Sequence, residues 1–163
     1  MKTYMIADLH FGHQNIIKYC RPEFANVDEM DKTIIENWNN VVSPEDEVFV
    51  LGDLSLSADY DFVKSCIQQL NGKKSLILGN HDNFTIEQYY SMGFDFVSKY
   101  PIIYKGFYLL SHEPLFVTEM MPFMNIYGHV HDSAIYETRT SRGWCVCVER
   151  HNYYPVEFNP ESY

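Results

Sequence analysis

Short apolar runs alternate with longer amphipathic segments through the first half of the chain. Three buried strands are predicted, at residues 3–7, 47–51 and 75–78. Apolar side chains recur at helical spacing in three further segments, at residues 28–42, 58–70 and 85–92. Thr85 and Gly93 are the expected cap and stop of the last of these. This alternation predicts a sheet that is covered by helices on a face.

The pattern changes after residue 94, where short strands separated by turn residues replace the helices. The candidates are residues 96–100, 102–104, 107–110, 125–127, 144–148 and 154–158. A second group of strands in so short a chain predicts two sheets packed together, with helices outside them. The expected fold class is therefore α/β (α+β).

Each residue able to carry chemistry follows directly after one of the apolar strands. The set comprises Asp8, His10, Asp53, Asn80, His81, His112, His129 and His131. Ligands of open α/β sheets bind outside the carboxyl ends of the strands, so five strand ends would deliver these side chains to one edge. A glycine precedes three of the groups and permits close backbone approach there. One such histidine or aspartate would most simply be structural, but five coincidences favour a site.

The residue types indicate a transition-metal site. Carboxylate, imidazole and amide oxygen together suit Mn, Fe, Zn or Ni, whereas calcium prefers oxygen ligands alone. Seven ligands from this set already exceed what one ion takes and suit two ions that share a carboxylate. Two metals ~3.5–4 Å apart are the known arrangement for displacement at phosphate esters.

These residues form five blocks in order. They are Asp8-Leu9-His10, Gly52-Asp53, Gly79-Asn80-His81-Asp82, His112 and Gly128-His129-Val130-His131. The blocks resemble the calcineurin-like metallophosphoesterase family, whose pattern is D-x-H, GD, GNH[D/E], H and GHxH. The resemblance implies a four-layer α-β-β-α double β-sandwich. A chain of 163 residues is expected to hold it as one domain, 1–163, without a separate cap domain.

The resemblance also implies roles. The first metal would be held by Asp8, His10 and His131, the second by Asn80, His112 and His129, with Asp53 bridging both. His81 would face the substrate as general acid or stabilise charge on the phosphoryl oxygens. The nucleophile would be a hydroxide that bridges the metals. Two divalent transition-metal ions are expected, with Mn favoured over Fe, Zn or Ni.

A narrower resemblance lies in residues 10–17 and 19–22 and in the run 148–156. These segments are similar to a branch of small bacterial and phage-type members. His13 and Arg21 are candidate contacts to a substrate phosphate, Arg21 through a bidentate fork. Their structural alternatives are a polar residue at a helix start and a surface cation.

One departure from the wider superfamily bears on the substrate. Protein Ser/Thr phosphatases continue GD as GDxxDRG, but here Gly52-Asp53 is followed by Leu-Ser-Leu-Ser. A phosphoprotein substrate is therefore disfavoured. Asp82 is interpreted as a cap of the following helix rather than as a partner of His81, and His151 as structural or exposed.

Composition limits the partners and the compartment. Twelve basic and 22 acidic residues give a net charge of −10, and no basic run exceeds Lys73-Lys74, which disfavours nucleic acid. No segment reads as a membrane span or signal peptide, so a cytoplasmic location without membrane contact is expected. Cys145 and Cys147 share one face of a strand, and the four cysteines are interpreted as reduced, packed thiols.

The function expected from the sequence is a dinuclear metal-dependent phosphoesterase. A short chain leaves the site open, which favours a phosphodiester or nucleotide-like substrate, with a small monoester as the alternative. Two other functions stay open, namely a non-catalytic protein-interaction scaffold on the same fold and a nuclease that processes nucleic-acid ends. The chain is expected to be a monomer or a small homo-oligomer.

Overall fold

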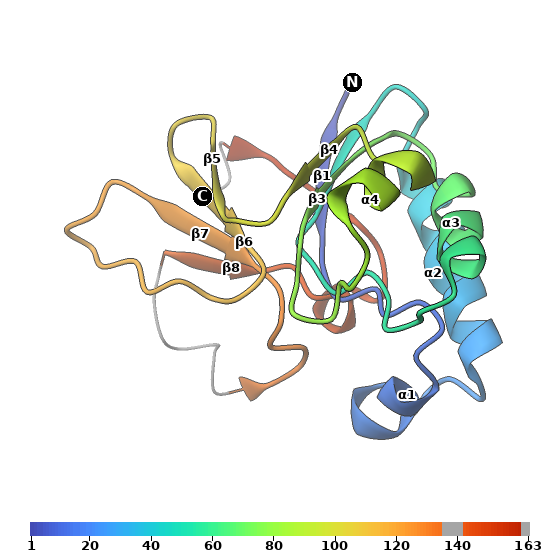
Figure 1. The fold of residues 1–163 in the computed structure, drawn as a ribbon. Helices are drawn as coiled ribbons and strands as arrows, with labels where there is room; N and C mark the ends of the chain where they lie inside the picture. Colours follow the sequence, from blue (N-terminus) through green and yellow to red (C-terminus); the bar gives the residue numbers. More distant parts are fainter. Residues whose placement is uncertain (135–141, 161–163) are drawn as a thin grey trace.

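Three apolar strands run parallel at the centre of a five-stranded sheet: β1 (Thr3–Ile6), β2 (Glu47–Val50) and β3 (Lys73–Ile77). β4 (Phe96–Ser98) extends the sheet parallel to β3, and β9 (Val156–Glu157) pairs antiparallel with β1. The order is β4-β3-β2-β1-β9. This computed structural model describes residues 1–134 and 142–160 (Figure 1).

A second sheet of four strands packs against the first. It is built from β5 (Ile102–Tyr104), β6 (Tyr108–Ser111), β7 (Met124–Tyr127) and β8 (Gly143–Cys145), in sequence order. β5 and β6 form an antiparallel pair, whereas β6, β7 and β8 run parallel. The expectation of two packed sheets in a mixed α/β fold is therefore confirmed.

Three of the described α-helices begin at a polar side chain that caps their first turn. In α2 (Val27–Val41) Asn26 accepts from the Glu29 N–H, and in α3 (Tyr60–Gln68) Asp59 accepts from the Phe62 N–H. α4 (Ile86–Met92) begins with a Thr85 capping box and ends at the left-handed Gly93. Sequence reasoning did not anticipate α1 (Gln14–Cys20), a seven-residue helix without a side-chain cap, nor the 3₁₀ helix η2 (Val148–His151).

The alternation of side chains along the strands separates two cores. Tyr4 and Ile6 of β1 join the cluster beneath the helices, whereas Met5 and Ala7 join the cluster between the sheets. The inter-sheet cluster is otherwise built from Phe49, Leu51, Ile77, Tyr108, Leu110, Met124, Ile126, Val146 and Phe158. β1 and β2 are therefore buried on both faces, and only their ends are free to carry polar groups.

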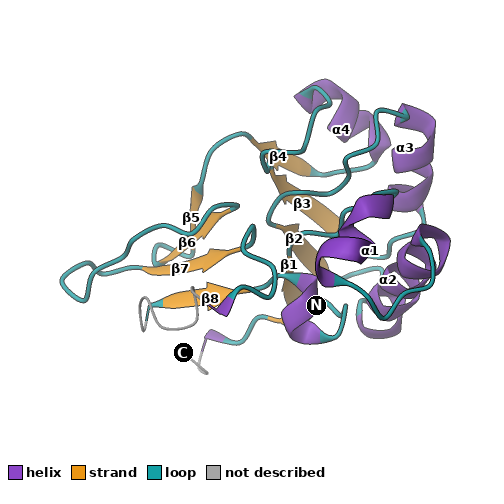
Figure 2. Ribbon diagram, turned by 90° about the horizontal axis from the view of Figure 1, so that it is seen from below, coloured by secondary structure: helices purple, strands orange, loops and turns teal. Residues whose placement is uncertain are grey.

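All four α-helices lie on one face of the first sheet, and each contributes buried side chains to the same cluster. Figure 2 shows helices, first sheet and second sheet as successive layers. The expected helices outside the second sheet are not found among residues 1–134 and 142–160. A loop lies there instead. Buried Asn125 of β7 holds this loop by accepting from the Leu115 N–H, and its amide also donates to Leu109 O and Ser111 Oγ.

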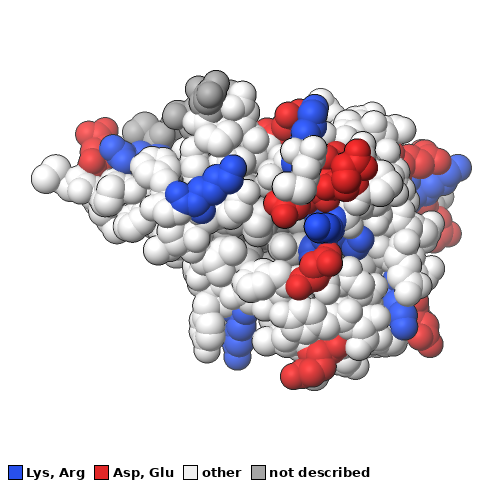
Figure 3. Space-filling model, turned by 90° about the horizontal axis from the view of Figure 1, so that it is seen from above, with Lys and Arg blue, Asp and Glu red and all other residues white. Residues whose placement is uncertain are grey.

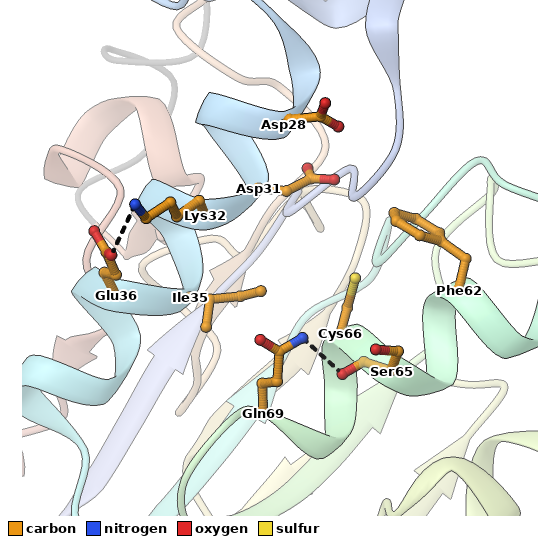
Figure 4. A pocket seen from close by; sticks show the side chains of 9 residues that line it. All are labelled: Asp28, Asp31, Lys32, Ile35, Glu36, Phe62, Ser65, Cys66 and Gln69. Atoms are coloured by element: carbon orange, nitrogen blue, oxygen red, sulfur yellow. Dashed lines mark hydrogen bonds and ion pairs between the residues drawn. The ribbon is translucent and has the colours of Figure 1, made fainter.

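One buried acid joins the helical layer to the loop that follows β1. The carboxylate of Asp31, on α2, accepts from the Gly12 N–H at 3.0 Å. It lies in a pocket between α2 and α3, with Phe62 and Cys66 on the opposite wall (Figure 4). Burial raises the pKa of Asp31 to about 7, although the Gly12 hydrogen bond opposes the shift.

We expect Asp31→Asn to flatten the pH dependence of stability. Because the folded-state pKa of Asp31 is raised, its contribution to the free energy of unfolding falls as pH rises from about 4 to about 7. Urea unfolding of both proteins at pH 5 and pH 8 should show that the stability of the variant relative to the wild type is up to about 3 kcal/mol greater at the higher pH. Asp61→Asn, at an exposed position on α3, is the control. Equal pH slopes in wild type and Asp31→Asn would contradict the assignment.

Candidate metal centre

The ends of strands from both sheets meet at one edge of the molecule. Asp8 and His10 follow β1, Asp53 follows β2, and Asn80 follows β3 in the first sheet. From the second sheet, His112 follows β6, and His129 and His131 follow β7. The structure brings all seven side chains together in two adjoining clusters.

The first cluster consists of Asp8, His10 and His131. Asp8 Oδ1 lies 3.9 Å from His10 Nε2 and 4.0 Å from His131 Nε2. Asp8 Oδ1 and His10 Nε2 are buried, and neither has a hydrogen-bond partner among the described residues. A buried polar atom without a partner is costly, so this pair of atoms fits a bound cation.

The second cluster consists of Asn80, His112 and His129. Asn80 Oδ1 lies 3.0 Å from both His112 Nε2 and His129 Nδ1, and the two ring nitrogens are 3.1 Å apart. His112 Nδ1 lies 2.9 Å from Leu51 O, which fixes the orientation of the ring. Amide oxygen and imidazole nitrogens that converge in this way suit a transition-metal ion.

Asp53 lies between the clusters with one oxygen directed to each. Its Oδ2 is 3.5 Å from His10 Nε2, and its Oδ1 is 3.4 Å from His112 Nε2. Oδ1 also accepts from the His81 backbone N–H at 3.0 Å. The geometry suits a carboxylate shared by two ions.

Burial and charge pull the pKa values of these groups apart. Burial raises the pKa of Asp8 to about 6 against the opposing pull of His112 and His131, and it lowers the pKa of His10 to about 3. Burial would also raise the pKa of Asp53, but the hydrogen bond and charge of His112 overcome it and lower the value to about 2. A neutral His10 keeps a lone pair available for a metal, and divalent cations would favour both carboxylates in their charged forms.

Two glycines lie so close to candidate ligands that no side chain fits at their positions. A Cβ on Gly79 would stand 2.3 Å from Asp53 Oδ1, and a Cβ on Gly128 would stand 2.6 Å from Asp8 Oδ2. Any side chain at these positions would enter the space of a candidate ligand. The glycines of the GNH and GHxH blocks are therefore steric requirements of the site.

Five of the seven candidate ligands have left-handed backbone conformations. Asp8, His10, Asp53, His129 and His131 have φ between 49° and 71°. Each such non-glycine residue costs on the order of 1–3 kcal/mol, and such strain gathers at functional sites. Hydrogen bonds from the surrounding chain are needed to hold these turns.

Asp82 supplies three of those hydrogen bonds. Its carboxylate accepts from the backbone N–H groups of Gly79, Asp53 and Leu54 at 2.8–2.9 Å. The interpretation of Asp82 as a helix cap is therefore wrong, because Thr85 caps α4. Asp82 therefore holds the turn after β3 against the turn after β2.

Arg21 does not face the site, and the expectation that it contacts a substrate phosphate is wrong. Its side chain has no exposed surface. The guanidinium donates to the backbone oxygens of Asp8 and Leu9 and pairs with Glu149. Glu149 was not among the sequence candidates, although it lies in the run 148–156 that carries the narrower resemblance.

His81 and His13 stand at the solvent side of the clusters. The His81 side chain is 44% exposed, and its Nε2 is 4.0 Å from Asp53 Oδ2. His13 is half-buried, with Nδ1 3.2 Å from His10 Nδ1. Asn80 and His129 are also exposed, so the centre is open to solvent on this side.

The cysteines and His151 lie outside the two clusters. All four cysteines are free thiols, and Cys145 Sγ is 3.2 Å from Cys147 Sγ. His151 is half-buried, with Nε2 2.9 Å from Cys145 O, as a structural role requires. Within the described residues, no helix combines the length and the apolar character that crossing a membrane requires.

Comparisons with known proteins agree with this geometry. The model of the family described as calcineurin-like phosphoesterase matches residues 1–159. The uncharacterized protein MJ1445 of Methanocaldococcus jannaschii is 40% identical over 133 residues, 76% of each chain. The Gene 66 protein of Mycobacterium phage L5 is 37% identical over 82 residues, which cover 49% of this chain and 39% of the phage protein.

Two solved structures share the fold. The protein of unknown function AQ665 from Aquifex aeolicus aligns with a TM-score of 0.72 and 29% identity, over 96% of this chain and 95% of its own. The Pseudomonas putida nuclease MPE aligns with a TM-score of 0.52 and 21% identity, over 79% of this chain and 61% of its own. The likeness to the nuclease is one of fold alone.

We expect Gly79→Ala to weaken divalent-metal binding by at least about tenfold, because its methyl group displaces Asp53 Oδ1. Calorimetric titration with Mn²⁺ measures the loss, and circular dichroism verifies the fold. Gly106→Ala is the control: it adds backbone strain at a φ of 70° but no overlap with a ligand, since a Cβ there meets nothing within 4 Å. Wild-type affinity in folded Gly79→Ala would refute the steric role.

Proposed function

The chain belongs to the calcineurin-like phosphoesterase family, and we propose that it is a dinuclear phosphoesterase that prefers phosphodiester or nucleotide-like substrates. Metal-dependent hydrolysis of phosphate esters is the activity of the family. The proposal adds the number of ions, the residues that hold them and the class of substrate. A small phosphate monoester is the second substrate class that the open site admits.

The observation that carries the proposal is the pair of buried, unpartnered atoms Asp8 Oδ1 and His10 Nε2 beside the shared Asp53 carboxylate. In the proposal, one ion is held by Asp8, His10, Asp53 and His131. The other is held by Asp53, Asn80, His112 and His129. Two bound dications would supply a nucleophile from water near neutral pH and neutralise charge on the phosphoryl group. The nitrogen and oxygen donors suit Mn, Fe, Zn or Ni, and the proposal takes manganese as the ion to test first.

His81 is the proposed general acid. Its backbone N–H is tied to Asp53 Oδ1, so the side chain keeps a fixed place beside the shared carboxylate. The ring reaches solvent and lies where a leaving-group oxygen would approach. A protonated imidazole there would deliver a proton to that oxygen as the ester bond breaks. His13, on the same side, is proposed to donate to a non-bridging phosphoryl oxygen.

Two other functions weigh less. The likeness of fold to a nuclease supports nucleic-acid ends as substrates, but the net charge of −10 disfavours duplex binding. On the face shown in Figure 3, the drawn Lys and Arg side chains are interspersed with Asp and Glu. A pure interaction scaffold would not need the complete ligand set together with His81, so the intact site argues for catalysis.

We expect Asp53→Asn to abolish Mn²⁺-dependent hydrolysis of a generic aryl phosphodiester, with kcat/KM falling by more than about 100-fold. The amide lacks the second anionic oxygen that the two clusters share. Assays on metal-stripped protein titrated with Mn²⁺ test this, with Asp61→Asn, at an exposed helical position, as control. Undiminished turnover in folded Asp53→Asn would sink the two-metal assignment.

We expect His81→Gln to lower kcat by roughly 10²–10⁴-fold on substrates with poor leaving groups. The loss should shrink for a nitrophenyl leaving group, which departs without a proton. Metal stoichiometry should stay at the wild-type value, because His81 is no ligand in the proposal. An equal loss on both kinds of substrate would assign His81 to charge stabilisation instead.

A further inference from the structure

Two buried residues of opposite charge lie behind the first cluster, on the side away from solvent. The Arg21 side chain is 0% exposed, and that of Glu149 is 4% exposed. Glu149 Oε1 is 2.9 Å from Arg21 Nε and 2.8 Å from Arg21 Nη2. Neither residue can reach a substrate, yet each touches a different part of the first cluster.

We propose that Arg21 and Glu149 act as a positioning pair that builds the first metal site and leaves the second site unaffected. Arg21 holds the turn that carries Asp8 and His10, while Glu149 directs the imidazole of His131. This inference rests on the proposed two-metal centre but not on any particular substrate.

Arg21 acts on the backbone of the first cluster. Its Nη1 donates to Leu9 O at 2.9 Å, and its Nη2 donates to Asp8 O. Asp8 and His10, on either side of Leu9, both have left-handed φ values. A planar guanidinium can serve two carbonyl oxygens and a carboxylate together, which the single ammonium of lysine cannot do in this geometry.

Glu149 acts on a side chain of the first cluster. Its Oε1 lies 2.8 Å from His131 Nδ1, and a carboxylate only accepts hydrogen bonds, so the proton belongs on Nδ1. The lone pair is then on Nε2, the atom that faces Asp8 Oδ1. A carboxylate behind a ligating histidine fixes its tautomer and raises its basicity. The neighbouring Arg150 Nε donates to His131 O at 2.7 Å and holds the backbone as well.

The second cluster is supported differently. Its buried histidine, His112, has Nδ1 against the neutral oxygen of Leu51 rather than against a carboxylate. Within the described chain, no hydrogen bond or ion pair of Arg21 or Glu149 reaches Asn80, His112 or His129. Removing the charge of Glu149 should therefore act on one metal site only.

A third ion is the competing interpretation of the same residues. Cys20, His131 and Glu149 also come within ligand distance of one another. However, the Arg21 guanidinium already places a positive charge on Glu149 Oε1 through two contacts. A further cation at that oxygen would be repelled by it. Glu149 Oε2 is buried without a hydrogen-bond partner among the described residues, and the Cys20→Ser variant below tests whether an ion binds there.

The test compares Mn²⁺ binding in the full-length wild type and in Glu149→Gln, by calorimetry and by electron paramagnetic resonance. We expect two ions per chain with an exchange-coupled spectrum in the wild type. In Glu149→Gln, one site should lose at least about tenfold in affinity, leaving the six-line spectrum of an isolated ion. Glu157→Gln, which removes an exposed partner of Lys2, should keep both ions. Arg21→Lys should weaken the same site as Glu149→Gln.

A measurement on the wild type keeps the proposal testable if the variants do not fold. In Zn²⁺-loaded, ¹⁵N-labelled protein, His131 should carry its proton on Nδ1, with the metal on Nε2. The opposite arrangement would overturn the role of Glu149. If the wild type binds two ions and folded Glu149→Gln loses both, the claim that the pair acts on one site only would be overturned. A third ion that is lost in Cys20→Ser would overturn the Arg21–Glu149 positioning role in favour of a metal at that place. A wild type that binds no ion would instead refute the two-metal function itself.

Discussion

The burial of two carboxylates at the ends of neighbouring parallel strands is the constraint on which the rest of the structure depends. Asp8 is 0% exposed and Asp53 is 2% exposed. The segments that follow β1 and β2 stay paired beyond the strands, because the Asp8 N–H donates to Gly52 O. Two like charges in a poorly solvated position are costly unless cations or donors offset them. The edge of both sheets is arranged to supply those partners. Histidines follow β6 and β7, and backbone N–H groups come from the turns.

The strain of the site follows from the same constraint. To face a common point, side chains from five strand ends must leave their strands abruptly, and five of them do so through left-handed backbone. Such turns persist only when other contacts hold them. Asp82 holds the turns after β2 and β3 with three backbone hydrogen bonds. Arg21 holds the turn after β1 through two carbonyl oxygens. Both residues are charged and neither is a proposed ligand, so the centre depends on a second set of charges behind it.

Features that local interactions determine could be predicted from the sequence, whereas features that depend on contacts between distant residues could not. The strands, α2 and α4 follow from apolar periodicity and from caps such as Thr85, which are local signals. The seven clustered residues were found because each directly follows a strand. α1 was missed because it has no cap and is held by tertiary packing of Ile16 and Ile17. The role of Arg21 was misjudged because its partner Glu149 lies 128 residues away, which no local pattern records. The helices expected outside the second sheet came from the general rule for packed layers as well as from the family resemblance, whereas buried Asn125 in β7 holds a loop there.

The candidate ligands differ in depth, and this difference decides which side chains a substrate would meet. Asp8 and His10 are at most 1% exposed and are backed by a buried ion pair, whereas Asn80 and His129 are exposed. His13 and His81 stand beside His10 of the first cluster: His13 Nδ1 is 3.2 Å from His10 Nδ1, and the ring centroids of His81 and His10 are 5.8 Å apart. A ligand arriving from solvent would therefore meet Asn80 and His129 on one side and these two histidines on the other. In the proposed function, the phosphoryl group would lie between these two sides, near the shared Asp53 carboxylate.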